Sequence, residues 1–158
     1  QEALYRKFAD TMYRVAWTYA KDDDEAADIL QDGFINCFRN LHRYKFEGSF
    51  EGWIRRIIVN KALEYYRSKR RKEEVTREYY ERQEHSTDDL LSGIQARELI
   101  GMVNHLPDKA AMVLKLYAIE GYAHREIADL MGISEGTSKS QLNRARGLLR
   151  DRIEKLNG

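Results

Sequence analysis

The sequence lacks the features on which disulfides, strands and membrane spans depend. Its 158 residues include one cysteine and one proline. Cys37 has no disulfide partner within the chain, which indicates a reducing compartment. No apolar run approaches the roughly 20 residues that cross a bilayer, and no signal peptide opens the chain. These three features predict a protein located in the cytoplasm. No segment alternates polar and apolar residues as a strand would, so we expect an all-α fold.

Residue 1 is Gln and not Met. We therefore expect that a few leading residues have been lost or trimmed.

The residue types that carry catalytic chemistry are scattered along the chain. The four histidines, His42, His85, His105 and His124, do not have the spacing of metal ligands. Cys37 has no adjacent partner that would activate it, and no glycine-rich loop is present to hold a phosphate. This pattern argues against an enzyme and predicts no metal, no cofactor and no small-molecule substrate.

A large excess of one charge is missing as well. The formal net charge is +1, so the molecule as a whole would attract DNA only weakly. Charge is instead separated locally: residues 22–25 read DDDE and residues 67–72 read RSKRRK. Any attraction to a nucleic acid must come from such local clusters.

The stretch from Gly121 to Arg146 predicts a helix-turn-helix. Gly132 can take the left-handed backbone that ends the first helix, and Ser134 can cap the second, three residues before Thr137. The second helix carries side chains that reach phosphates and base edges in a major groove: Lys139, Gln141, Asn143, Arg144 and Arg146. The alternative is an ordinary helical hairpin with a solvated basic face.

Apolar residues at spacings of three and four predict three helices in residues 1–70, which form one small domain. The first helix ends near Ala20. The second is capped by Asp23 or Asp24 and runs to about Leu41, and Ser49 caps the third.

Residues 71–87 are charged, contain few apolar side chains and read as a linker, partly helical at most. Residues 88–158 form the second domain, which contains the helix-turn-helix. Its first helix is capped by one of residues 86–88, and Pro107 fits the first turn of the next. The expected fold is therefore two small helical domains joined by a charged linker.

Four stretches in this order resemble the extracytoplasmic-function (ECF) group of the sigma-70 family of bacterial sigma factors. They are the opening stretch, Ala27–Leu41 (ADILQDGFINCFRNL), Phe50–Arg67 (FEGWIRRIIVNKALEYYR) and Leu106–Tyr117 (LPDKAAMVLKLY). The resemblance covers nearly the whole chain. It implies two helical domains that bind core RNA polymerase and direct promoter-specific transcription initiation. The alternative is a stand-alone helix-turn-helix regulator that binds duplex DNA without polymerase.

The resemblance also implies three sets of site residues. The second helix docks on a coiled coil of the polymerase's largest subunit, through Asp28, Gln31, Asp32, Asn36 and Arg39. The next loop and helix open the minus-ten element and hold it as single strand, through Tyr44, Lys45, Phe46, Arg56, Asn60 and Lys61. The helix-turn-helix reads the minus-thirty-five element as duplex, through Arg125, Lys139, Ser140, Gln141, Asn143 and Arg144.

Two positions depart from the family pattern. Ala123 stands where a capping Ser or Thr is usual, and Phe46 stands where relatives often have glycine. We expect Trp53 to pack inside its domain rather than to stack on DNA. In this family, a membrane-anchored anti-sigma factor commonly masks the DNA-binding faces, and we expect such a partner here.

Overall fold

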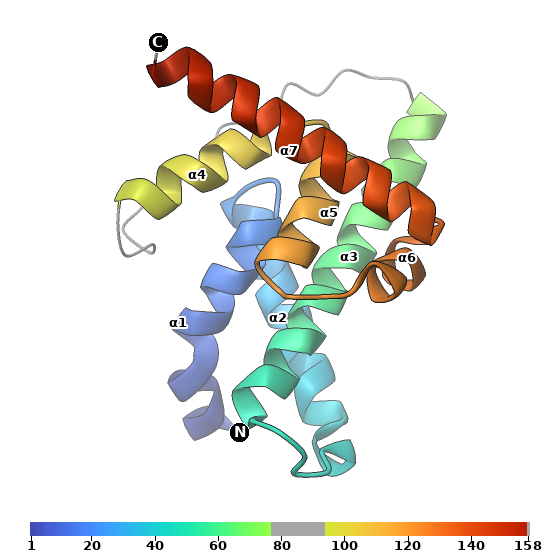
Figure 1. Ribbon diagram of the computed structural model, residues 1–158. Helices are drawn as coiled ribbons and strands as arrows, with labels where there is room; N and C mark the ends of the chain where they lie inside the picture. The colour runs from blue at the N-terminus through green and yellow to red at the C-terminus, as the bar shows by residue number, and fades with distance from the viewer. Residues whose placement is uncertain (77–93, 158) are drawn as a thin grey trace. The chain divides into compact units, whose positions relative to one another are not determined.

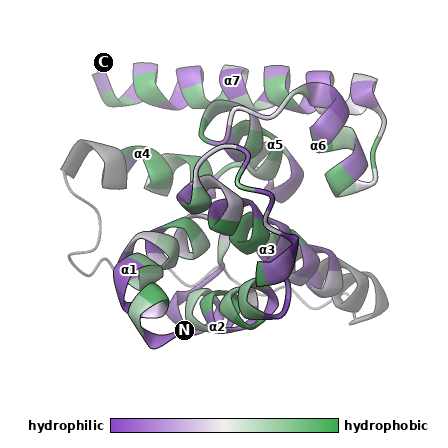
Figure 2. Ribbon diagram, turned by 90° about the horizontal axis from the view of Figure 1, so that it is seen from below, coloured by the Kyte–Doolittle hydropathy of each residue, from purple (hydrophilic) through white to green (hydrophobic). Residues whose placement is uncertain are grey.

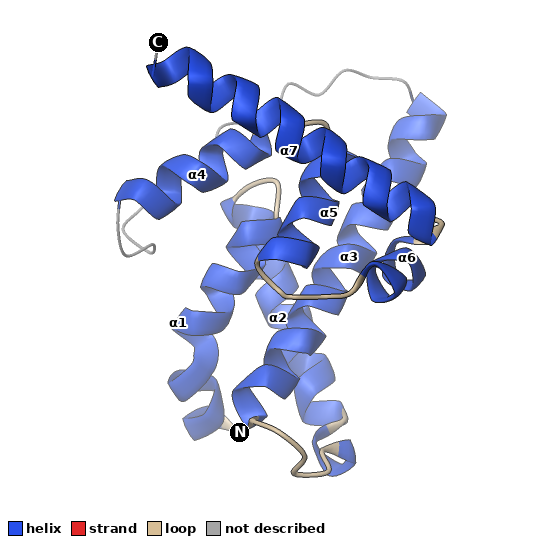
Figure 3. Ribbon diagram, in the orientation of Figure 1, coloured by secondary structure: helices blue, strands red, loops and turns tan. Residues whose placement is uncertain are grey.

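The structure is a computed structural model that describes residues 1–76 and 94–157. All regular elements in these two ranges are helices (Figure 1, Figure 3), which confirms the all-α prediction. The chain divides into two compact units, Gln1–Leu90 (unit 1) and Leu91–Gly158 (unit 2).

Unit 1 consists of three helices around one apolar core. They are α1 (Glu2–Tyr19), α2 (Asp23–Arg39) and α3 (Phe50–Thr76), with a short 3₁₀ helix, η1 (Leu41–Arg43), between the last two. Each of the three α-helices packs against the other two. Their apolar faces bury Met12, Ile29, Cys37, Ile54 and Ile58 completely.

The caps of unit 1 agree in part with the sequence analysis. Ser49 caps α3 as expected, because its Oγ accepts a hydrogen bond from the Gly52 N–H at 3.0 Å. The expected cap of α2 at Asp23 or Asp24 was wrong. The N-cap is Asp22, whose backbone is extended and whose Oδ1 accepts a hydrogen bond from the Glu25 N–H at 2.7 Å. Asp23, Asp24 and Glu25 lie in the first turn, where their negative charges interact favourably with the helix dipole.

Two helix ends in unit 1 differ from their predicted positions. Helix α2 stops at Arg39, and Leu41 begins η1 instead of extending α2. Helix α3 continues to Thr76 and so enters the segment expected to be linker. Residues 67–74 consist mainly of Arg, Lys and Glu, and these residues have high helix propensity even where nothing apolar is buried.

Unit 2 contains α4 (Ile94–Asn104), α5 (Asp108–Ala118), α6 (His124–Met131) and α7 (Glu135–Asn157). Helix α5 packs against α7, and Val113, Leu116, Ile127 and Ala145 have no exposed surface. Hydrophobic and hydrophilic bands alternate along α7 (Figure 2), as expected for a helix with one buried face.

Pro107 occupies the N-cap position of α5, one residue before the predicted first turn. Its missing N–H costs nothing there, because the first amides of a helix have no partner within the helix. The predicted caps at residues 86–88 and most of the predicted linker lie outside the described residues.

Candidate nucleic-acid and protein interfaces

The outer face of α2 carries most of the residues predicted to meet a protein partner. Asp28, Gln31 and Arg39 are exposed, whereas Asn36 is half-buried. Among them lies Ile35, whose side chain is 41% exposed. Ile35 was not among the residues predicted from the sequence. An exposed isoleucine one turn after Gln31 is the signal that could have identified it.

Asp32, the fifth residue of that set, faces the neighbouring helix. The Tyr65 hydroxyl of α3 donates a hydrogen bond to Asp32 Oδ2 at 2.5 Å. Burial, this hydrogen bond and the nearby negative charges of Asp32, Asp28 and Glu25 raise the pKa of Tyr65. The phenol therefore stays protonated and joins α2 to α3.

A cleft of about 660 Å³ lies between the start of α2 and the middle of α3. Six carboxylates and three ammonium groups line it, together with Tyr65 and Ser68. The charged residues are Asp22, Asp24, Glu25, Asp28, Asp32, Glu64, Lys21, Lys61 and Lys69. The cleft therefore has a negative balance of charge.

Lys61 belongs to this cleft. Its side chain is only 16% exposed, and its Nζ forms an ion pair with the Glu64 carboxylate at 2.7 Å. Arg56 and Asn60, one turn apart on α3, are instead exposed. The structure therefore places Arg56 and Asn60 on one open face and turns Lys61 toward α2.

The loop before α3 is organised around Tyr44. The Tyr44 hydroxyl donates to the Gly48 carbonyl at 2.9 Å, which closes the loop. Its ring lies 5.1 Å from the ring of Phe50 and 5.4 Å from that of Trp53. Trp53 thus packs within unit 1, as expected. Lys45 and Phe46, at the tip of the loop, are exposed.

The helix-turn-helix has the predicted turn. Gly132 is left-handed, with φ 67° and ψ 37°, and Ser134 Oγ accepts from the Thr137 N–H at 3.0 Å. Ala123 provides no side-chain cap for α6. Glu126 supplies half of a capping box, since its carboxylate accepts from the Ala123 N–H at 3.3 Å.

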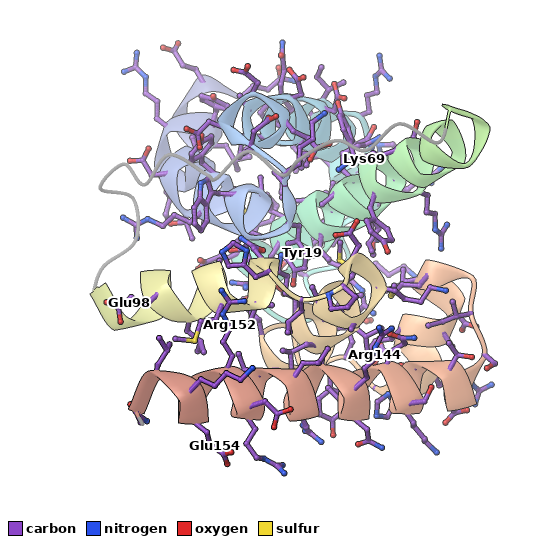
Figure 4. The ribbon with its side chains drawn as sticks, turned by 90° about the horizontal axis from the view of Figure 1, so that it is seen from above. Tyr19, Lys69, Glu98, Arg144, Arg152 and Glu154 are labelled. Carbon is purple, nitrogen blue, oxygen red and sulfur yellow. The ribbon has the colours of Figure 1, made fainter. Side chains whose placement is uncertain are left out.

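Most residues predicted to contact duplex DNA are exposed. They are Arg125 of α6 and Lys139, Ser140, Asn143 and Arg144 of α7. Arg144 lies in the first half of α7, whereas Arg152 and Glu154 lie toward its C-terminal end (Figure 4). Gln141 differs: it is half-buried, and its Oε1 has no hydrogen-bond partner among the described residues.

A contact between α6 and α7 in unit 2 was not predicted from the sequence. The Ser138 side chain is completely buried in α7, and its Oγ lies 2.8 Å from His124 Nδ1 of α6. The His124 ring stacks on Tyr117 of α5, with 4.8 Å between ring centroids. Residues from three helices therefore fix how α6 and α7 meet.

Two sequence models match the two units. Sigma-70 region 2 matches residues 4–72, and Sigma-70, region 4 matches residues 96–149. Over 98% of its length, the chain is 31% identical to the ECF RNA polymerase sigma factor SigE of Mycolicibacterium smegmatis. This chain belongs to the ECF sigma factors of the sigma-70 family. Members of the family are transcription initiation factors and not enzymes.

Other relatives of this ECF sigma factor are similar over most of their length. The chain is 26% identical to the sigma-E factor of Haemophilus influenzae and covers 77% of that protein. It is also 26% identical to SigM of Bacillus subtilis and covers 92% of that protein. It spans 62% of the length of SigE.

Two solved structures share the fold. The sigma factor RpoE of Bartonella quintana, in complex with the anti-sigma factor NepR, aligns with a TM-score of 0.66 at 16% identity, over 98% of both chains. CnrH, in complex with the cytosolic domain of CnrY, aligns with a TM-score of 0.54 at 19% identity, over 98% of this chain and 87% of CnrH.

Two features are absent from the part of this ECF sigma factor that the structure describes. No helix in residues 1–76 or 94–157 is long and apolar enough to cross a membrane. Within the same ranges, no group of three or more His, Cys, Asp or Glu side chains could hold a metal ion.

Proposed function

We propose that this chain directs core RNA polymerase to its promoters and that the outer face of α2 is the polymerase contact. The proposed contact residues are Asp28, Gln31, Asn36 and Arg39, together with Asp32, whose carboxylate also accepts the hydrogen bond from Tyr65. Exposed carboxylates and amides on a packed helix can pair with arginines of a partner helix. The exposed Ile35 beside them supports a protein partner, because the centres of such interfaces are enriched in apolar contacts.

The loop 43–50 and the adjoining face of α3 are the proposed site for the minus-ten element as single strand. Tyr44, Lys45 and Phe46 contribute from the loop, and Arg56, Asn60 and Lys61 contribute from α3. The Asn60 amide can donate to and accept from a base edge, while Arg56 is suited to a phosphate. Because the Lys61 side chain is only 16% exposed, we expect it to contribute less than the exposed Arg56.

Helix α7 is the proposed reader of the minus-thirty-five element in the major groove. Lys139, Ser140, Asn143 and Arg144 lie on its exposed surface, and Arg125 of α6 is placed to meet a phosphate. Gln141 belongs to this set only if its half-buried amide turns outward on binding.

The observation that carries the proposal is the pair of exposed surfaces on unit 1, the α2 face and the α3 face with its aromatic loop. A stand-alone helix-turn-helix regulator would use unit 2 alone and would leave both surfaces without a role. The two functions therefore differ in whether unit 1 is needed.

Single-round transcription with core polymerase and a library of candidate promoters tests the proposal. We expect new start sites that depend on this protein, and alignment of the promoters used would reveal both elements. Asn60→Ala should reduce strand opening, measured by permanganate reactivity, more than it reduces polymerase binding. Arg14→Ala, an exposed change on α1, is the control and should alter neither. Failure to bind core polymerase, combined with tight binding to duplex promoters, would favour the regulator.

We also propose that the chain acts in the cytoplasm and is held inactive there by a membrane-anchored anti-sigma factor. The complex of RpoE with NepR supports an anti-sigma partner, and the complex of CnrH with the cytosolic domain of CnrY supports contact on the cytosolic side. Fractionation of cells carrying the tagged chain should recover it on membranes, in a complex that cannot bind core polymerase. Recovery with polymerase under every growth condition would contradict this proposal.

A further inference from the structure

Ser138 is a polar residue in an otherwise apolar contact between α6 and α7. Two hydrophilic residues are buried in the described part of the chain, Lys115 and Ser138, and only Ser138 has no exposed surface. Ile127 of α6 and Leu142, one turn after Ser138 in α7, are buried as well. A buried hydroxyl without a hydrogen-bond partner costs free energy that a methyl group would not. This position therefore suits serine only while a polar partner stays beside it.

The partner is His124, whose Nδ1 lies 2.8 Å from the Ser138 Oγ. An imidazole nitrogen can accept from a hydroxyl or donate to it, so the two groups satisfy each other. The His124 ring is itself held in place, because it stacks on Tyr117 of α5 with 20° between the ring planes. The Arg146 guanidinium of α7 lies 5.5 Å from the centre of the same Tyr117 ring. Tyr117 therefore contacts both of the helices that the hydrogen bond joins.

The hydrogen bond restricts the two helices more than their apolar contacts do. A hydrogen bond weakens steeply when its length or angle changes, whereas apolar burial has no preferred direction. A buried polar pair whose members satisfy each other therefore favours one arrangement of the surrounding helices. The pair of His124 and Ser138 favours one register of α7 on α6.

This register relates the side chains that are proposed to contact duplex DNA. Arg125, the proposed phosphate contact, directly follows His124 in α6, and Lys139 and Ser140 directly follow Ser138 in α7. Phosphate contacts position a recognition helix, and base contacts specify the sequence. If α7 moved relative to α6, the phosphate contact and the base contacts would no longer fit the same stretch of DNA.

We propose that His124 and Ser138 are positioning residues for recognition of the minus-thirty-five element. This inference rests on the proposed function of α7. A hydrogen bond that only stabilised unit 2 could be replaced by two apolar side chains at little cost, because neither polar group would remain unpaired. The positioning role predicts that the same replacement preserves the fold and reduces discrimination between base sequences.

The test measures stability and discrimination separately. The variants are His124→Phe, Ser138→Ala and the double variant His124→Phe/Ser138→Ala, each as the full chain bound to core polymerase. Phenylalanine keeps a ring that can stack on Tyr117 but has no Nδ1. Discrimination is the ratio of affinities for a promoter selected in the transcription assay and for the same promoter with single base changes in the minus-thirty-five element.

The double variant should separate the two properties. We expect its melting temperature to be close to that of wild type and its discrimination at one or more base positions to fall by about tenfold. His124→Phe alone leaves the Ser138 hydroxyl without His124 and should melt at a lower temperature than the double variant.

Two further variants serve as controls. The amide of His124→Asn can still form a hydrogen bond to Ser138 and should restore part of the discrimination that His124→Phe loses. His105→Phe makes the same change at an exposed position between α4 and α5 and should bind and discriminate like wild type.

The outcomes distinguish this inference from the proposed function. If the double variant discriminates like wild type, or if discrimination only follows the melting temperature across the variants, the positioning role is refuted and the function stands. An equal loss of affinity for every promoter, with the ratio unchanged, would also refute it. Should the double variant not fold, equal discrimination by His124→Phe and His124→Asn would refute it instead. If the wild-type holoenzyme shows no preference at the minus-thirty-five element, both proposals fail.

Discussion

The packing of α2 against α3 depends on the absence of a side chain at Gly33. A Cβ built on Gly33 would lie 2.3 Å from Ile58 Cδ1, 3.5 Å from Ile58 Cγ1 and 3.6 Å from Ile58 Cα. The first distance is far inside van der Waals contact, whereas the other two are ordinary. Because Ile58 has no exposed surface, its Cδ1 cannot move away without disturbing the core.

These distances allow the effect of Gly33→Ala to be estimated. Alanine in a helix interior is favoured over glycine by about 1 kcal/mol. Overpacking a dense core costs about 1–3 kcal/mol. With a cost near the middle of that range, Gly33→Ala should lower the free energy of unfolding of unit 1 by about 1 kcal/mol. Ile58→Val removes only the clashing Cδ1 and should, by itself, also cost about 1 kcal/mol.

The double variant is the decisive one. In Gly33→Ala/Ile58→Val the clash is absent, the new methyl group fills the space left by Cδ1, and the gain in helix propensity remains. We expect stability close to that of wild type, and therefore a coupling energy of about 2 kcal/mol between the two sites. Both tryptophans, Trp17 and Trp53, lie in unit 1, so urea unfolding followed by tryptophan fluorescence reports on this unit.

A matched control isolates the contribution of propensity. A Cβ at Gly147 in α7 would meet nothing within 4 Å. Gly147→Ala should therefore stabilise unit 2 by about 1 kcal/mol, measured by circular dichroism. If Gly33→Ala proves as stabilising as Gly147→Ala, or if the two single effects simply add in the double variant, the steric argument is wrong.

Three further results are expected. Ala123→Ser should raise the free energy of unfolding of unit 2 by about 1 kcal/mol, since its hydroxyl would complete the capping box begun by Glu126; an unchanged urea midpoint would contradict this. Tyr65→Phe should destabilise unit 1 by about 1–2 kcal/mol near neutral pH. The folded state raises the pKa of Tyr65, so the stabilising contribution of its hydroxyl is complete below about pH 10. Above that pH, the contribution should shrink by ~1.4 kcal/mol per pH unit. The assignment would be refuted by a difference in the free energy of unfolding between Tyr65→Phe and wild type that stays constant in urea titrations up to about pH 11. Cys37 has no exposed surface, and burial raises the pKa of its thiol. A thiol reagent should therefore label Cys37 only when the chain unfolds. Rapid labelling of the native chain would instead show that the core opens there.

Local features of this chain were predictable because neighbouring residues determine them. The Ser134 cap and the left-handed Gly132 follow from hydrogen bonds within one turn. The spacing of apolar residues likewise predicted each described α-helix, although the ends were displaced by a few residues at α2 and α3 and the short 3₁₀ helix η1 was not predicted. Lys and Glu favour a helix whatever their burial, so periodicity alone could not locate the end of α3.

Features that depend on two helices could not be predicted. Helical periodicity assigns a residue to a face, but it does not reveal which neighbour that face meets. The Tyr65–Asp32 hydrogen bond joins residues 33 positions apart, and the His124–Ser138 contact joins α6 to a buried position of α7. The positive φ of Phe46 could not be predicted either, because a phenylalanine in a sequence does not indicate a left-handed backbone.

The cleft between α2 and α3 affects how the proposed sites must be tested. Asp32 was assigned to the polymerase and Lys61 to DNA, yet both line this cleft. Removing the Asp32 carboxylate would leave the Tyr65 hydroxyl without its acceptor, so Asp32→Ala would disturb the packing of α3 as well as the outer face of α2. A loss of polymerase binding in that variant would have two possible origins. Asp28 and Gln31 are exposed on the same helix face, and substitutions there test the polymerase contact without disturbing the joint between the helices.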